Sequence, residues 1–390
     1  MRLVRSSAVA VTGATGFLGS LIAAGLLAEG RRRLVLPVRS HHSPESVSAR
    51  LTKELAALGV HLPDLAERVT ILPLPANEEI PSLAGAFRRL GVEEIVHAAG
   101  CVDYFHTENL TKGNIELTLG FVKLAQELHA RRFTFISTSF SSGFYTGPIP
   151  ETLHAEADED PTEYTKSKRR AEGLVADSGI PYLIVRPSVV IGDSRDGRYG
   201  GKRYGIYQLW YAADRLMCTE YLPIIYAIAP RLPLPLIHQD AFQAGFLAAF
   251  RSLPDNSVFH LVSRDESLPT VRDLWDLWLH QVARPRQLYY FQRLADVPLE
   301  KLCRNQQIWV EMTGVNLDIS SRSWHFESHH LDRLRRHGLH FTDVTIDSMR
   351  QCQERFIAES PRVRGFIDKY RSERAVHPKV IECDAADAVA

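Results

Sequence analysis

Two side chains of the sequence, Tyr164 and Lys168, lie four residues apart and together could transfer protons. On a helix this spacing places both side chains on one face. A tyrosine with its ordinary pKa of about 10 is a weak acid–base catalyst at neutral pH, but a neighbouring ammonium favours the phenolate and lowers that pKa. The other N–H donors of a lysine can hold a ribose hydroxyl. Because a Tyr-x-x-x-Lys spacing also arises by chance on surface helices, the pair predicts a redox site only together with further signals.

Hydroxyl groups follow a buried strand that we expect over residues 133–137. In open α/β sheets, ligands bind outside the C-terminal ends of the strands, so the hydroxyls of Ser137-Thr138-Ser139 should reach such a crevice. A hydroxyl there can hydrogen-bond a carbonyl oxygen as that oxygen gains negative charge during reduction.

A glycine-rich turn over residues 12–19 lies between the first expected strand and the first expected helix. Its three glycines permit a tight turn, a close approach of the backbone to a pyrophosphate, and close packing of helix on strand. The N-terminus of the helix adds N–H groups and the positive end of its dipole. The turn therefore predicts a dinucleotide site, with a purely structural turn as the alternative. The residues expected to bind the cofactor here are Thr12, Gly13, Thr15, Gly16, Phe17, Leu18 and Gly19.

The end of the second expected strand indicates which nucleotide binds. An acidic residue there would accept the ribose 2′-hydroxyl of NAD, whereas this chain has Arg39, whose guanidinium can pair with a 2′-phosphate. We therefore expect NADPH, with an ordinary surface cation as the alternative. After the fourth strand, the small residues Ala98 and Ala99 would let the adenosine and ribose lie against the backbone, with a tightly packed strand end as the alternative. His97 is expected to be structural, because no metal-ligand spacing surrounds it.

Seven short apolar runs alternate with helical patterns in the N-terminal two-thirds of the chain. In residues 115–129, for example, Leu117, Phe121, Leu124 and Leu128 recur at helical spacing. Continuous apolar strands that alternate with helices predict a parallel sheet covered on both faces, a Rossmann-type doubly wound α/β fold. The expected strands are Ala8–Val11, Leu34–Val38, Val69–Leu74, Glu94–His97, Phe133–Ser137, Tyr182–Val185 and Val258–Val262.

The pattern changes after about residue 200, which indicates a second region. We expect a dinucleotide-binding domain over residues 1–200, to which residues 237–265 return. A smaller, mostly helical substrate-binding region would then consist of residues 201–236 and 266–372. The segment 373–390 lacks periodicity and is expected to be poorly ordered.

Two segments of the second half could contact a substrate. Apolar side chains within residues 204–236 offer a surface for an acyl chain, or simply form a helical core. The basic loop 195–203 could meet a phosphopantetheine or an acidic carrier protein, or be an ordinary solvated loop. The acidic stretch 151–160 is expected to be solvated and could fold over the site.

Composition and charge exclude other classes of protein. The 390 residues carry 46 basic and 46 acidic side chains, which argues against a strongly basic nucleic-acid binder. Five scattered cysteines without a C-x-x-C pair favour free thiols in a reducing compartment, so we expect a cytoplasmic protein without a metal site.

Glycines interrupt the apolar stretch 8–28, which argues against a secretory leader. Prolines interrupt the apolar run 221–237, which is therefore unsuited to spanning a membrane but could contact one peripherally.

Together, these motifs resemble the extended short-chain dehydrogenase/reductase family, over about residues 6–265. The motifs that occur in the family order are the glycine turn, His97-Ala98-Ala99-Gly100, Ser137-Thr138, the Tyr164–Lys168 run and Arg186-Pro187-Ser188. Within the family the chain looks most similar to the fatty acyl-CoA reductase and thioester-reductase branch. The features that indicate this branch are Val38-Arg39-Ser40, the run from His97 to Phe105, Gly113-Asn114 and residues 186–197.

The resemblance implies a Ser/Thr–Tyr–Lys site that works on NADPH. Thr138 would be the catalytic hydroxyl, with Ser139 close enough to compete. Tyr164 would be the proton donor, and Lys168 would modulate this tyrosine. The residues implied to contact the cofactor after the sixth strand are Pro187 and Ser188. Asn114 matches only loosely and is assigned no chemistry, and Ala76-Asn77 replaces the Gly-Asp that the branch usually carries, which puts the adenine contact in doubt.

The expected reaction is NADPH-dependent reduction of a fatty acyl-CoA or carrier-protein thioester. Hydride transfer to the carbonyl carbon, with a proton from Tyr164, gives a hemithioacetal that collapses to an aldehyde and a thiol; a second hydride transfer would give the alcohol. One alternative is a sugar-nucleotide epimerase or dehydratase, or a hydroxysteroid-type dehydrogenase, and Arg39 argues against the sugar-nucleotide enzymes because they generally retain NAD. Another is a catalytically silent NADP-binding sensor, against which the intact Tyr164 and Lys168 argue.

Overall fold

The computed structural model describes residues 7–30, 32–102, 106–374 and 377–383, and the chain divides into two compact units. Unit 1 comprises the chain up to Ser188, Phe242–Val262 and Phe326–Phe341. Unit 2 comprises Val189–Ala241, Ser263–His325 and the chain from Thr342 onward. Residues 103–105, which end the run that supports the predicted branch, and residues 384–390 of the predicted tail lie outside the described residues.

A seven-stranded parallel sheet forms the centre of unit 1, in the order β10-β6-β5-β4-β1-β2-β3. The order reverses between β1 and β4, so a crevice for a ligand is expected at the C-terminal ends of these two strands. All seven predicted strands are present, and the predicted doubly wound fold is confirmed. The strands are β1 (Ala8–Thr12), β2 (Arg33–Val38), β3 (Val69–Pro73), β4 (Val92–His97), β5 (Arg132–Ile136), β6 (Tyr182–Pro187) and β10 (Ser257–Leu261).

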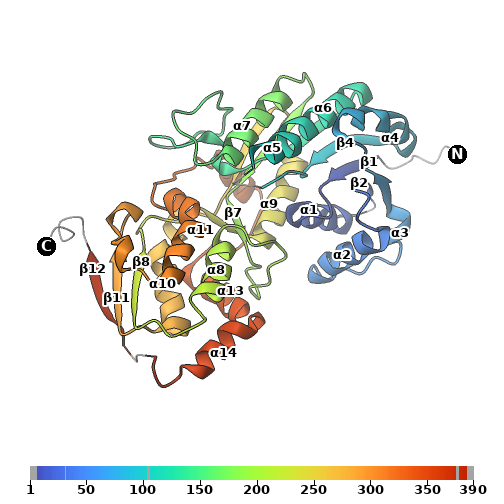
Figure 1. The fold of residues 1–390 in the computed structure, drawn as a ribbon. Coiled ribbons are helices and arrows are strands. Elements are labelled where there is room, and N and C mark those ends of the chain that lie inside the picture. Colours follow the sequence, from blue (N-terminus) through green and yellow to red (C-terminus); the bar gives the residue numbers. More distant parts are fainter. Residues whose placement is uncertain (1–6, 31, 103–105, 375–376, 384–390) are drawn as a thin grey trace. The chain divides into compact units, whose positions relative to one another are not determined.

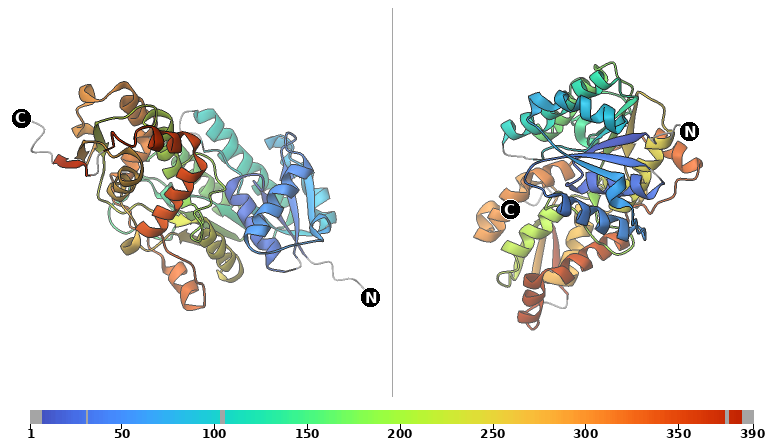
Figure 2. Two further views of the ribbon diagram at one scale, coloured as in Figure 1. Left: turned by 90° about the horizontal axis from the view of Figure 1, so that it is seen from below. Right: turned by 90° about the vertical axis from the view of Figure 1, so that its right-hand side faces the viewer.

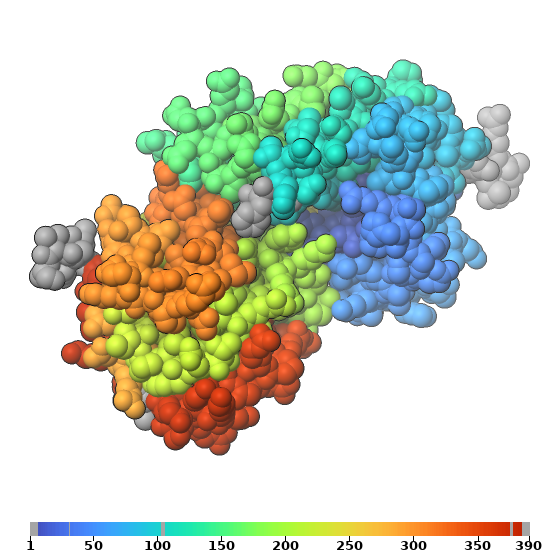
Figure 3. Space-filling model, in the orientation of Figure 1, coloured from blue at the N-terminus to red at the C-terminus, as the bar shows by residue number. Residues whose placement is uncertain are grey.

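Helices cover both faces of this sheet (Figures 1 and 2). Helices α4, α6 and α7 pack on one face, and α1, α2 and α9 lie on the other. On the surface, the green α7 segment lies beside the teal α5 and α6 segments (Figure 3). The helices of unit 1 are α1 (Phe17–Ala28), α2 (Pro44–Ala57), α3 (Leu65–Arg68), α4 (Ala84–Leu90), α5 (Thr107–Leu110), α6 (Leu117–Leu128), α7 (Glu163–Ala176), α9 (Gln239–Ser252) and α12 (His329–Arg336).

Local sequence explains where the helices next to the site begin. Helix α7 starts with a capping box, in which the hydroxyl of Thr162 accepts a hydrogen bond from the backbone N–H of Thr165 and the side chain of Thr165 accepts one from the backbone N–H of Thr162. The predicted apolar stripe of α6 is buried against Phe87, Phe133 and other side chains of one core cluster. A six-residue π-helical turn, Thr111–Glu116, leads into α6, and a short 3₁₀ turn, Ser139–Ser142, follows β5.

Unit 2 contains more sheet than the sequence predicts. A three-stranded parallel sheet has the order β12-β11-β8, and β7 pairs with β9 in a two-stranded parallel sheet. Its strands are β7 (Val189–Ile191), β8 (Ile224–Ile228), β9 (Leu236–His238), β11 (Gln287–Phe291) and β12 (Lys379–Cys383). Its helices are α8 (Ile206–Leu216), α10 (Val271–Trp278), α11 (Arg304–Ser320), α13 (Ile346–Glu359) and α14 (Pro361–Lys369).

The structure differs from the predicted organisation in three details. The first unit ends at Ser188 rather than near residue 200, because β7 pairs with β9 and so belongs to unit 2. The segment 326–341 joins unit 1, where Phe326 bridges to Ile149. Part of the tail predicted to lack order forms β12, because its five residues add to the edge of β11 over a full strand length. So short a strand has too few residues for its periodicity to be recognised.

Candidate active site

The glycine turn between β1 and α1 packs directly against the loop that follows β4. Gly13 has a φ of +73°, and a Cβ placed there would lie 2.7 Å from the backbone N of Ala99 and 2.8 Å from the carbonyl O of Ala98. A Cβ on Gly19 would collide with the carbonyl of Gly13. Gly16 caps α1 without a side chain that could accept hydrogen bonds from its first turn. These residues fit the pyrophosphate of a dinucleotide, because they expose backbone and leave no room for side chains.

The residue before the turn, Thr12, is held in a buried chain of hydrogen bonds. Its Oγ1 accepts from the N–H of Ala99 (3.0 Å) and lies 2.9 Å from Nδ1 of His97. Nε2 of His97 lies 3.1 Å from Oγ1 of Thr118, which donates to the carbonyl O of Asn114 (2.6 Å). Since each hydroxyl has one proton, we assign Thr12 as donor to Nδ1 and Nε2–H as donor to Thr118. Burial, with the nearby Lys168 charge, lowers the pKa of His97 to about 3, so the ring is neutral.

Asn114, which the sequence left without a role, joins the loop after β4 to α7. Its Oδ1 accepts from the N–H of Cys101 (2.8 Å), and its Nδ2 donates to the carbonyl O of Cys101 (2.9 Å) and to Oγ of Ser167 (2.9 Å). Ser167 in turn donates to the carbonyl O of Tyr164 (2.7 Å). Asn114 lies in the π-helical turn, which is a common local feature of functional sites. In the sequence, the signal for this role of Asn114 is the Gly113-Asn114 pair before a helix. Gly113 allows the close approach to the loop after β4, because a Cβ on it would lie 2.6 Å from Cβ of Cys101.

Helix α7 docks on the end of β5 through Lys168. The Nζ of this buried lysine donates to the carbonyl O of Ile136 (2.7 Å) and lies 4.1 Å from the centre of the Phe135 ring. A Cβ on Gly100 would lie 3.9 Å from the same Nζ, so the loop after β4 also reaches the lysine. Burial lowers the pKa of Lys168 to about 7, against the opposite effect of the Glu172 carboxylate. A cationic group that titrates near neutral pH is thus placed where two strand ends meet.

The predicted catalytic hydroxyl and phenol lie on the segments that Lys168 brings together. Thr138 follows Ile136 by two residues, and its Oγ1 accepts from the N–H of Phe140 (3.4 Å). Thr138 keeps 7% of its surface exposed whereas Ser139 keeps none, so of the two Thr138 is the better placed to reach a ligand. Oγ of Ser139 has no hydrogen-bond partner among the described residues. The Tyr164 side chain is half-buried, one turn before Lys168 on the same face of α7.

The remaining predicted cofactor residues lie at other strand ends of unit 1. Arg39 is exposed and directly follows β2, the parallel neighbour of β1. Pro187 and Ser188, at the end of β6, are buried, and Ser188 donates its backbone N–H to the carbonyl O of Leu261 (3.1 Å). The side chain of Ser188 has no hydrogen-bond partner in the described part of the chain.

The basic loop and the acidic stretch considered in the sequence both make contacts within their own units. In the basic loop 195–203, Arg195 forms a two-point ion pair with Asp193 (2.7 and 2.8 Å), and its carbonyl accepts from Gln351 (2.8 Å). The acidic stretch 151–160 is tied to α7, because Arg169 pairs with both carboxylate oxygens of Asp160 (2.5 and 2.6 Å).

Most of the apolar side chains within residues 204–236 fill the core of unit 2. Tyr207, Trp210, Ile225 and Ile228 are almost fully buried in one cluster, whereas Tyr204 and Ile224 remain exposed. The core interpretation of this segment therefore fits better than that of an open acyl surface.

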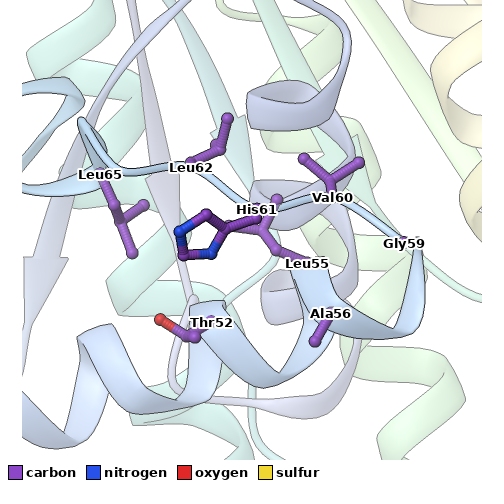
Figure 4. Close-up of a pocket in the computed structure, with 8 residues that line it drawn as sticks. All are labelled: Thr52, Leu55, Ala56, Gly59, Val60, His61, Leu62 and Leu65. Atoms are coloured by element: carbon purple, nitrogen blue, oxygen red, sulfur yellow. The ribbon is translucent and has the colours of Figure 1, made fainter.

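A small apolar cavity of about 270 Å³ lies elsewhere in unit 1, at the C-terminal end of α2 (Figure 4). None of the predicted site residues lines it. Its lining comes from one short stretch, namely Thr52, Leu55, Ala56, Gly59, Val60, His61, Leu62 and Leu65. In the described part of the chain, no helix is both long and apolar enough to cross a membrane.

Comparisons with known proteins agree with this fold. A linear gramicidin synthase of Brevibacillus parabrevis is 32% identical over 207 residues, which are 49% of this chain but only 4% of the much longer synthase. The terminal R domain from the myxalamid PKS-NRPS pathway has a similar structure, with a TM-score of 0.70 at 20% identity over 93% of this chain and 92% of that one. A thiolation-reductase di-domain from an archaeal non-ribosomal peptide synthetase gives a TM-score of 0.65 at 17% identity, over 94% of this chain and 76% of that one.

The family is shown by a match over more than half of the chain. Residues 11–233 match the NAD-binding family described as male sterility protein, and this range contains every site residue predicted from the sequence. The protein therefore belongs to this NAD-binding family and is an oxidoreductase of the extended short-chain dehydrogenase/reductase type, which confirms the resemblance found in the sequence.

Proposed function

We propose that this chain reduces an acyl thioester, carried by coenzyme A or by a carrier protein, to an aldehyde with NADPH. The observation that carries the proposal is the docking of Lys168 on Ile136, because it joins the helix of Tyr164 to the strand end of Thr138. The similarity to a thiolation-reductase di-domain and to a terminal R domain supports a thioester as the substrate class.

When bound, NADPH supplies the hydride for the carbonyl carbon of the thioester. Thr138 and Tyr164 donate hydrogen bonds to the carbonyl oxygen as it gains negative charge. Tyr164 then gives up its proton, and the ammonium of Lys168 stabilises the phenolate that remains. The resulting hemithioacetal collapses to an aldehyde and a thiol, which leaves readily because its pKa is only about 8.5.

The titration of Lys168 sets the expected pH dependence. Because burial lowers its pKa to about 7, this lysine loses its charge as the pH rises through neutrality. The stabilisation of the phenolate is lost with the charge, so we expect the rate of thioester reduction to fall on the alkaline side of pH 7.

NADPH rather than NADH is proposed because of the position of Arg39. The end of the strand next to the glycine turn is where the adenosine ribose binds in dinucleotide folds, and this chain has an exposed guanidinium there. A guanidinium can form two parallel charge-assisted hydrogen bonds with a phosphate, which the 2′-hydroxyl of NADH does not offer.

The test is NADPH oxidation by the purified protein, measured by absorbance with long-chain acyl-CoA, an acylated carrier protein, a UDP-sugar or a hydroxysteroid. We expect oxidation that depends on an acyl thioester and is abolished in Tyr164→Phe. Tyr182→Phe is the matched control, because Tyr182 is the first residue of β6 and so lies at the N-terminal end of the strand, away from the predicted site at the C-terminal ends. Conversion of a UDP-sugar without added cofactor would refute the proposal, and NADPH binding without turnover of any substrate would favour a sensor.

A further inference from the structure

A buried carboxylate, Glu172, lies on α7 one turn beyond the predicted catalytic pair. Glu172 follows Lys168 by four residues and Tyr164 by eight, so all three side chains share one face of the helix. Glu172 is 1% exposed, and a carboxylate so deeply buried is stable only when it is paired and fully hydrogen-bonded.

The partners of Glu172 come from the ends of β5 and β6 and from the 3₁₀ turn that follows β5. Arg186 on β6 forms a two-point ion pair with it, from Nε to Oε1 (3.0 Å) and from Nη2 to Oε2 (2.6 Å). Ser141 donates its hydroxyl to Oε1 (2.8 Å), and Ser137 donates to the same oxygen. Burial alone would raise the pKa of Glu172, but the Arg186 charge and the three donors hold it below its ordinary value, so the carboxylate stays ionised.

Each partner lies close to a predicted site residue in the sequence. Ser137 precedes Thr138, and Ser141 belongs to the 3₁₀ turn that Thr138 caps. Arg186 precedes Pro187 and Ser188 at the end of β6. One carboxylate thus fixes two strand ends relative to the helix that carries Tyr164 and Lys168.

We propose that Glu172 is a positioning residue of the active site, whose buried carboxylate sets the placement of α7 relative to the ends of β5 and β6. This inference rests on the proposed reductase function. Glu172 is buried and bound by groups of unit 1, so its substitution should act on the reaction through a shift of Tyr164 and Lys168 away from Thr138. Displacements of about 1 Å are enough to slow a positioned reaction strongly.

The charge of Glu172 also acts on Lys168. Other charged or titratable groups near this pair are Arg186 across the ion pair, His260 on β10, which lies 3.4 Å from Nη1 of Arg186, and His97 on the β4 side. His154 in the loop before α7 also faces Glu172 and Arg186. Of these, the Glu172 carboxylate is the group that favours the charged form of Lys168.

The test compares Glu172→Gln with Glu94→Gln. Glu94 is a matched control, since it is a buried carboxylate paired with Arg131 (2.8 Å) and Arg132 (3.4 Å) but lies in the first half of β4, away from the C-terminal edge. In Glu172→Gln we expect kcat for thioester reduction to fall about 10- to 100-fold, with KM for NADPH and thioester changed less than about 3-fold. We also expect the pKa of Lys168 to decrease, because the Glu172 charge that raises it is removed. Carbon-13 NMR at Cε of Lys168 measures this pKa, and Lys168→Arg assigns the signal. Glu94→Gln should change neither quantity.

Unchanged kcat and an unchanged Lys168 titration in Glu172→Gln would overturn the inference, as would equal losses in Glu94→Gln. If Glu172→Gln does not fold, Ser141→Ala decides instead, because it removes one donor and keeps the ion pair. It should lower kcat by about 3- to 10-fold without changing KM, and no effect would count against the inference. If the wild-type protein reduces no thioester, the proposed function fails; if the wild type is active and Glu172→Gln keeps its full kcat, the positioning role alone fails.

Discussion

Replacing His97 with phenylalanine tests the buried hydrogen-bond chain behind the glycine turn. The ring of His97 lies among Phe121, Phe133 and Phe135, at centre-to-centre distances of 5.1, 5.9 and 5.9 Å, so a phenyl ring fits the same space. The substitution removes the acceptor of the Thr12 hydroxyl and leaves that donor buried. Such an unsatisfied group costs about 1–3 kcal/mol of the free energy of unfolding, which is the loss that we expect at pH 7.5.

The effect of pH on this loss can be calculated from the same site. His97 has a pKa of about 3 in the folded chain and about 6.5 when unfolded, so the unfolded chain binds more protons between these values. Stability of the wild type therefore decreases as the pH falls through this window, by about 2 kcal/mol from this group at pH 5. The phenylalanine variant has no such group, so its deficit relative to the wild type should nearly vanish at pH 5. His260, whose burial also lowers its pKa to about 3, is present in both proteins and cancels.

The measurement must report on unit 1. All five tryptophans lie in unit 2, so their fluorescence is insensitive to unit 1, whereas hydrogen exchange of the backbone amides of β1 and β4 measures its opening directly. Exchange rates corrected for the intrinsic effect of pH, at pH 7.5 and at pH 5, give the two free-energy differences. If the stability deficit of the phenylalanine variant is the same at pH 7.5 and at pH 5, His97 is not neutral in the folded protein. That result would refute the donors and acceptors assigned to the hydrogen bonds between Thr12, His97 and Thr118.

Three further substitutions test other parts of the site. Gly13→Ala places a Cβ 2.7 Å from the backbone of Ala99 at a φ of +73°, so NADPH binding measured by calorimetry should weaken by at least about 100-fold; Gly173→Ala, with open space around it, is the control. Arg39→Ala should raise the Kd for NADPH about 10- to 100-fold and leave that for NADH nearly unchanged, and equal losses would defeat the assignment of the 2′-phosphate site. Burial raises the pKa of Glu151 to about 7, so the folded chain binds the extra proton and stability falls as the pH rises from about 4.5 to 7. Glu151→Gln should remove this fall, by about 1–3 kcal/mol in hydrogen-exchange stability of unit 1, and a parallel pH profile in both proteins would contradict the expectation.

The sheet of unit 1 was predictable because its signals are local. Each strand is a continuous apolar run, and buried parallel strands need no partner-specific pattern beyond that. The glycine turn was predictable for a similar reason: Gly13 adopts a positive φ, and a Cβ on Gly19 would collide with the Gly13 carbonyl within the same short turn. By contrast, β12 depends on pairing with β11, which lies far earlier in the chain, and no local property of its five residues indicates that partner.

The side chains that hold the site were harder to predict than those expected to act in it. Asn114 and Glu172 are unusual in neither spacing nor type, and their roles depend on partners that the fold brings together from 13 to 53 residues away. The structural role expected for His97 fits its position between Thr12 and Thr118, but the direction of its two hydrogen bonds requires the coordinates of both partners. Long-range polar contacts of this kind leave no periodic signal in a sequence.

At three strand ends, an anchor, a residue whose side chain is hydrogen-bonded inside unit 1, stands directly before a residue expected to meet the ligand, and one of these anchors, Thr12, is itself among the expected cofactor residues. Thr12 precedes Gly13, Ser137 precedes Thr138, and Arg186 precedes Pro187; in all three pairs the first member is hydrogen-bonded inside unit 1. For Arg186 and Pro187, which both lie in β6, the arrangement follows from strand geometry, because successive side chains point to opposite faces of a sheet. Since the anchors are buried polar groups, their loss leaves unsatisfied partners rather than an adaptable gap. The residues expected to meet the ligand are therefore held in place by neighbours that cannot move independently, which is why substitutions in the Glu172 network should act on the rate through the placement of those residues.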